Sequence, residues 1–133
     1  MTTPFFCLAI ACLLPYVWAP FQIPSRRAQF GTVDNKLPRV QQAQLQGRGA
    51  RALGAHHNAF EALTTFAPAV FVAHLAGADA ICSARLAVLF VICRVLHGIF
   101  YLADLDFARS GAFTVGLLCV IGLFVQAGMA AAH

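Results

Sequence analysis

The sequence is poor in charged residues. Asp, Glu, Lys and Arg together make up 11% of its 133 residues, hydrophobic residues make up 60%, and the mean hydropathy is +0.75. Soluble domains carry about 25% charged residues. The composition therefore excludes an ordinary soluble domain and indicates a membrane protein with a lipid bilayer as its surroundings.

Several patterns that carry chemistry are also missing. The five cysteines form no C-x-x-C pair and all lie in apolar stretches, so neither a disulfide framework nor a cysteine-based zinc site is indicated. There is no phosphate-binding loop, no Ser-His-Asp arrangement and no pair of catalytic carboxylates. These absences exclude the common hydrolase and nucleotide-binding signatures.

Four long apolar runs dominate what is present. A membrane helix needs about 20 mostly apolar residues, and such runs cover about residues 4–23, 55–77, 80–103 and 112–132. Within a bilayer the backbone must satisfy its own hydrogen bonds, which favours helices. The sequence predicts an all-α fold, a four-transmembrane-helix bundle that forms a single domain over residues 1–133.

The basic residues are concentrated between the first two runs. Six of the nine Lys and Arg residues lie in the predicted loop 24–54. Loops rich in Lys and Arg stay in the cytoplasm, so we expect this loop on the cytoplasmic side and both termini on the other. A loop near anionic lipid headgroups explains the net charge of +4, and no nucleic-acid partner is expected.

Polar residues inside the apolar runs are the candidate functional residues, because ionisable groups in membrane helices are costly and usually pair in the bundle interior. At about 100° per residue, Arg94, His97 and Tyr101 share one face of the third predicted helix. The second predicted helix carries Arg51, Asn58 and Glu61 on one face.

Glu61 and Arg94 lie at similar depths in an antiparallel helix pair, so we infer that they are ion-pair partners. Such a pair is either a clamp between helices or part of a binding site. Because Tyr101, His97, Asn58, Arg51 and Arg109 gather at the same leaflet, the sequence favours a polar pocket. His57 and Glu61 are four residues apart, but no third ligand is evident, and no metal is expected.

Two motifs resemble those of a known family. "RALGAHHNAFEALTTFAPAV" (51–70) matches an Arg-Ala…Ala-His-x-Asn-x-x-Glu pattern, and "RVLHGIFYLADLDFARS" (94–110) matches Arg-x-x-His-x-x-x-Tyr followed by a further Arg. Both patterns, in this order, resemble the membrane-associated proteins in eicosanoid and glutathione metabolism, the MAPEG family.

The resemblance implies a homotrimer of four-helix membrane subunits, with glutathione bound as co-substrate between neighbours near the cytoplasmic leaflet. By position, it implies that Arg51, Asn58, Glu61, Arg94 and His97 bind glutathione. It also implies that Arg109, which stabilises the thiolate, and Tyr101 are the catalytic residues. Glu61 is then free either to receive the glutathione amine or to stay paired with Arg94. The implied reaction is attack of the thiolate on a small lipophilic substrate, as in a transferase or peroxidase.

One position departs from the family. Relatives commonly carry Arg four residues before the motif Asn, whereas this chain has Gly54. A charge that anchors glutathione is therefore missing, and the change Gly54→Arg is expected to tighten binding. The alternative function is a non-catalytic membrane binding or structural protein whose polar cluster only fixes helix packing. A bacterial inner membrane is the expected location, and the sequence leaves an organelle membrane open.

Overall fold

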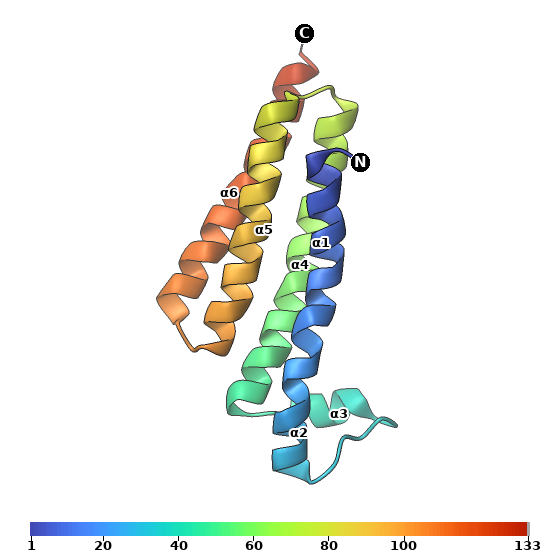
Figure 1. Ribbon diagram of the computed structural model, residues 1–133, viewed down its shortest axis with the longest axis vertical. Helices are drawn as coiled ribbons and strands as arrows, with labels where there is room; N and C mark the ends of the chain where they lie inside the picture. The colour runs from blue at the N-terminus through green and yellow to red at the C-terminus, as the bar shows by residue number, and fades with distance from the viewer. Residues whose placement is uncertain (133) are drawn as a thin grey trace.

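The computed structural model describes residues 1–132, and these form helices joined by short turns (Figure 1). The first helix, α1 (Thr3–Trp18), runs through a 3₁₀ turn, η1 (Ala19–Gln22), into α2 (Ile23–Phe30). The remaining helices are α3 (Pro38–Ala43), α4 (Gly47–Leu75), α5 (Ala80–Leu102) and α6 (Asp106–Ala130).

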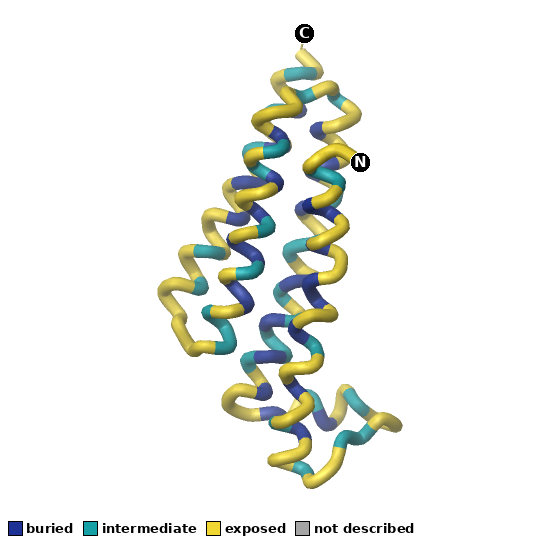
Figure 2. Tube along the Cα trace, in the orientation of Figure 1, coloured by how far each residue is buried: buried dark blue, intermediate teal, exposed yellow. Residues whose placement is uncertain are grey.

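The long helices α1, α4, α5 and α6 lie side by side, with both termini at one end of the bundle and α2 and α3 at the other (Figure 1). Helices α4 and α5 form the centre, because each packs against the other three long helices. Their facing surfaces are called here the α4–α5 seam. Figure 2 shows buried residues on the facing sides of the helices and exposed residues on the outer sides.

The outer surface is apolar. Large hydrophobic side chains such as Leu13, Leu75, Ile81 and Leu118 are more than half exposed. Apolar area of this extent on a single chain marks a surface that faces lipid or another protein.

Three helical segments are long and apolar enough to cross a membrane, namely Thr3–Phe30, Ala80–Leu102 and Asp106–Ala130. Among the helices of the described residues 1–132, α4 does not meet this criterion of length and hydropathy. Its polar residues, among them His57, Asn58 and Glu61, lower its mean hydropathy. The all-helical fold is therefore confirmed, with three candidate spans, while the predicted fourth span at 55–77 stays a prediction.

Much of the predicted loop 24–54 is helical. Helix α4 begins at Gly47, and α2 and α3 occupy much of the remainder. The buried side chain of Arg26 organises this segment, because its Nε donates to Gln41 Oε1 at 2.6 Å and its Nη2 donates to the Asp34 carbonyl at 2.7 Å. Gly31, at φ 72°, ends α2 in a left-handed conformation that favours glycine.

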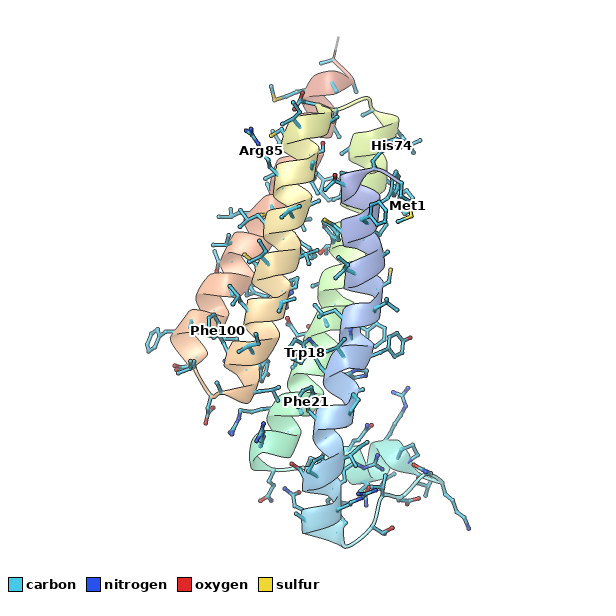
Figure 3. The ribbon with its side chains drawn as sticks, viewed as in Figure 1. Met1, Trp18, Phe21, His74, Arg85 and Phe100 are labelled. Carbon is cyan, nitrogen blue, oxygen red and sulfur yellow. The ribbon has the colours of Figure 1, made fainter. Side chains whose placement is uncertain are left out.

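Helix α1 contacts α5 through Trp18, which is 6% exposed and lies in the half of the bundle near α2 (Figure 3). Its indole ring lies directly against Gly98, where a Cβ atom would overlap the ring. Helix α1 also contacts α4 through a hydrogen bond between His56 Nδ1 and the Pro15 carbonyl, at 2.8 Å. These contacts fix the position of α1 beside the end of the seam that carries the candidate residues.

Candidate functional site

The candidate residues face one another along the α4–α5 seam in matched spacing. On α4, Arg51, Gly54, Asn58 and Glu61 follow steps of three, four and three residues. On the opposing chain segment, Arg94, His97, Tyr101 and Asp104 follow the same steps. Because the helices are antiparallel, the beginning of one series meets the end of the other.

Three contacts connect the two series. Arg51 Nη1 lies 3.1 Å from Asp104 Oδ2, and Arg94 Nη2 donates to Asn58 Oδ1. Between these two levels, the phenol of Tyr101 lies against the backbone of Gly54. The structure therefore brings the residues predicted from both motifs to one end of the seam.

The predicted direct ion pair between Glu61 and Arg94 is wrong in this chain. Among residues 1–132 the ion pair within 4.0 Å is Arg51–Asp104. Asn58 lies between the predicted partners, since it accepts from Arg94 and its Nδ2 donates to Glu61 Oε2 at 3.3 Å. The long Arg94 side chain reaches the Asn58 level, about one helical turn from Glu61, so equal depth along the helices did not produce a pair.

Two buried donors at this end of the seam lack partners. Arg94 is 4% exposed, and in residues 1–132 the buried side-chain N and O atoms without a hydrogen-bond partner are Arg51 Nε and Arg94 Nε. A buried polar atom without a partner is costly and is uncommon in folded proteins. Both unpaired atoms belong to guanidinium groups, which suit carboxylate acceptors.

Tyr101, His97 and Arg109 form an aromatic and cationic cluster. The Arg109 guanidinium lies over the Tyr101 ring, 4.4 Å from its centroid, and the His97 ring meets Tyr101 edge to face at 5.6 Å. His97 is 4% exposed. Helix α6 thus places Arg109 beside the residues of α5, within the first turns of α6 and not in a connecting loop.

The packing of Tyr101 explains the glycine at position 54. A Cβ atom on Gly54 would lie 2.6 Å from the Tyr101 hydroxyl oxygen and 2.7 Å from Cζ. Both distances are far below van der Waals contact, and Arg109 and His97 pack against the same ring. The expectation that Gly54→Arg would tighten binding therefore lacks structural support, because Tyr101 fills the space that a side chain at position 54 would need.

A cavity of about 170 Å³ opens beside Arg94 between α4, α5 and α6. Glu61, Thr65 and Arg94 supply its polar wall, and Phe90, Phe113 and Leu117 belong to its apolar wall. Small-molecule sites commonly measure about 300 to 1,000 Å³. A single chain therefore encloses only part of a site for a ligand of tripeptide size.

A larger cavity, of about 540 Å³, lies at the opposite end of the bundle. Its walls include the N-terminal residues Met1 to Phe5 and also His74. Figure 3 shows Met1 and His74 near each other at this end. No residue predicted for the glutathione site lines this cavity.

One polar face of α4 is uncovered in the single chain. His57, Glu61, Thr64 and Thr65 lie on this face and are exposed. The hydroxyls of Thr64 and Thr65 donate to backbone carbonyls within the helix, at 2.7 and 3.0 Å, which satisfies those two donors. The Glu61 carboxylate accepts only the long bond from Asn58 among the described residues.

Two contacts were missed in the sequence. Asp104 continues the face of Arg94, His97 and Tyr101 by one further step of three residues, and this spacing could have identified it. The bond from His56 to Pro15 carries no comparable signal, because it depends on how α1 crosses α4.

A comparison with protein families finds that the model described as "MAPEG family" matches residues 3–129. A comparison with curated proteins finds no match to the chain.

Proposed function

The chain belongs to the MAPEG family and is an integral membrane protein, and we propose that it binds glutathione and activates its thiol for attack on a lipophilic electrophile. The observation that carries this proposal is the pair of buried, unpartnered Nε atoms on Arg51 and Arg94. Glutathione supplies two carboxylates, which are suitable acceptors for both groups.

The proposed site extends along α4 from Arg51 to Glu61. These residues are ten positions apart, a separation of about 15 Å along a helix. Three fully extended residues span at most about 11 Å, so the side chains at both ends must reach inwards to contact one tripeptide. Arg51, Asn58 and Arg94 bind carboxylate and amide groups of glutathione, and Glu61 receives its amine. His97 forms the buried floor beside Tyr101.

Arg109 supplies the activating charge. A free thiol has a pKa of about 8.5, and a neighbouring guanidinium favours the thiolate, which is the nucleophile. The thiol proton passes to water at the cytoplasmic face. The sulfur electron pair then forms an S–C bond to the electrophile, and the leaving group departs with the electrons of its bond. Tyr101 holds Arg109 in place through its ring.

The site is completed by neighbouring copies in a homotrimer. The polar face of α4 is exposed in the single chain, and a carboxylate such as Glu61 is unfavourable against lipid. A second copy that covers this face shields Glu61 and adds walls to the 170 Å³ cavity. With α4 covered in this way, its low hydropathy is compatible with a fourth span. Native mass spectrometry in mild detergent should show a trimer, and a monomer would exclude a site between subunits.

The proposed topology places residues 24–54 in the cytoplasm and both termini on the opposite side. Single cysteines at Gln42 and Ala131, in a protein without its native cysteines, should be labelled from opposite sides of a bilayer. Labelling of both from one side would contradict the four-span arrangement.

Calorimetry on the detergent-purified protein tests glutathione binding, with S-hexyl glutathione as the thiol-blocked ligand. Thiolate absorbance near neutral pH should appear on adding glutathione and disappear in Arg109→Ala. Arg85→Ala is the matched control, because Arg85 lies on α5 towards the other end of the bundle (Figure 3). Absence of binding to the unmodified protein would contradict the proposal.

The second candidate is a non-catalytic protein that binds through the same cluster. The observation in its favour is Gly54. Proteins with the motif that this chain resembles commonly carry Arg at this position, whereas here Tyr101 fills the space that a side chain would need. Glutathione binding without any thiolate signal would support this function in place of the enzyme.

A further inference from the structure

Asp104 has an unusual backbone conformation for its residue type. It has a φ of 63°, whereas the other positive-φ residues in the described part of the chain are the glycines Gly31, Gly47 and Gly77. Residues other than glycine are disfavoured in this region, although Asp and Asn are tolerated best.

The turn around Asp104 would accommodate glycine. Asp104 N donates to the Tyr101 carbonyl at 3.3 Å, and Leu105 N donates to the Phe100 carbonyl at 2.9 Å. This pair of bonds is the Schellman motif that ends many helices, and its left-handed position is usually Gly. The backbone alone does not explain an aspartate here, so its side chain is the feature to account for.

The Asp104 carboxylate contacts one side of the Arg51 guanidinium. Its Oδ2 lies 3.1 Å from Nη1. In arginine, Nη1 lies on the side of Cδ, and the Nε and Nη2 hydrogens point together along the opposite edge. That edge is the one that binds a carboxylate through two parallel hydrogen bonds. The Nε atom of Arg51 is buried and has no hydrogen-bond partner among the described residues.

From these contacts we propose that Asp104 is a positioning residue, which holds Nη1 of Arg51 so that the free Nε–Nη2 edge is presented to a ligand carboxylate. This inference rests on the proposed glutathione site and adds a residue outside both sets of predicted ligands. The side chains of Arg51 and Asp104 are 29% and 69% exposed. Such an exposed pair contributes little to stability, so orientation is its main effect.

Asp104→Gly separates orientation from folding. Glycine relieves the left-handed backbone and keeps the Schellman bonds. The unfolding temperature should therefore be unchanged or higher, while glutathione binding weakens about two- to fivefold, the range for losing an exposed ion pair. Asp104→Asn keeps the shape of the side chain, and asparagine is tolerated in the same backbone conformation. This variant should also bind glutathione more weakly than the unmodified protein.

Controls isolate the contribution of the carboxylate. Asp106→Asn removes the same charge two residues away and keeps the oxygen that accepts from Phe107 N at 2.9 Å, so binding should be unchanged. Glutathione diethyl ester, which has no free carboxylate, should bind the unmodified protein and Asp104→Gly equally. In an Arg51→Gln background, Asp104→Gly should have no further effect on glutathione affinity.

Calorimetry with these proteins gives a clear decision. The inference is supported if Asp104→Gly weakens glutathione binding, but does not weaken diester binding and has no effect in the Arg51→Gln background. Equal or tighter binding in Asp104→Gly overturns it, since Asp104 would then be neutral or would compete with the ligand, and the proposed function would stand. Failure of glutathione to bind any of the proteins would overturn both.

Discussion

The two halves of the α4–α5 seam differ in how completely they are packed. Towards the chain termini, the Phe66 and Phe90 rings stack with centroids 3.8 Å apart, and they are 0% and 2% exposed. Towards α2 and α3, Arg51 and Arg94 meet Asp104 and Asn58, and both guanidinium groups keep an unpaired buried Nε.

Polar groups by themselves do not account for this difference. In the half near the termini, Ser83 Oγ donates to Gln126 Oε1 at 3.4 Å, and Gln126 Nε2 donates to Cys82 Sγ at 2.8 Å. These polar groups satisfy one another and complete the packing between α5 and α6. The half that carries the candidate site leaves donors free, which is the property expected of a site that binds a polar ligand.

The largest expected effect on stability is in the stacked half. Phe66→Ala removes a fully buried ring and leaves a cavity, so the free energy of unfolding should fall by about 3 to 5 kcal/mol. Phe124→Ala is the control, because Phe124 is 42% exposed and should cost far less. Unfolding in detergent measures both.

Glutathione affinity should survive in the fraction of Phe66→Ala that remains folded, since Phe66 does not line the cavity beside Arg94, although its stacking partner Phe90 does. Loss of binding in folded Phe66→Ala would mean that the two halves are not independent.

The next effect is in the polar half. Asn58→Leu removes the acceptor of Arg94 Nη2 while Arg94 stays buried, which should lower the free energy of unfolding by about 1 to 3 kcal/mol. Glutathione binding should be lost as well. The double variant Asn58→Leu, Arg94→Met should recover much of the stability, because no charge is left without a partner, but should not recover binding. Recovery of binding would place the ligand elsewhere.

The sequence predicted much of the helical architecture and the cluster of polar residues. The apolar runs and the steps of three and four residues depend on helix geometry, which a single chain specifies locally. It was less informative about partners across the seam. Equal depth suggested Glu61 with Arg94, but an arginine side chain can reach about one helical turn along the axis, and Arg94 donates to Asn58 instead.

Gly54 illustrates a second limit of the sequence. At the level of the motif, the residue looks like the loss of a charged ligand. In the structure, it makes room for Tyr101, seven residues beyond Arg94 on another helix. A large side chain on one helix can require a small residue on its neighbour. That requirement depends on how the helices pack, and the periodicity along one helix does not reveal it.

A pair of glycine variants tests this packing. Gly54→Ala should gain about 1 kcal/mol of helix propensity and lose about 1 to 3 kcal/mol by displacing the Tyr101 ring. Gly111→Ala gains the same propensity without a contact, because a Cβ there has nothing within 4 Å. The unfolding free energy of Gly54→Ala should therefore be lower than that of Gly111→Ala by about 1 to 3 kcal/mol. Equal values would show that Tyr101 moves away freely.

The smallest expected effect concerns the hydrogen bond that joins α1 to the polar half. His56→Phe keeps a ring against Phe60, whose centroid lies 5.2 Å away, and removes the bond to the Pro15 carbonyl. That carbonyl also accepts from Ala19 N, so it keeps a partner in the variant. The loss should therefore be only the net value of one hydrogen bond, about 0.5 to 1.5 kcal/mol. His74→Phe in the other half preserves the edge contact to Phe5, at 4.9 Å, and should change the unfolding free energy by less. If His74→Phe cost as much as His56→Phe, the cost would come from replacing a histidine ring, and the bond to Pro15 would not distinguish the two halves.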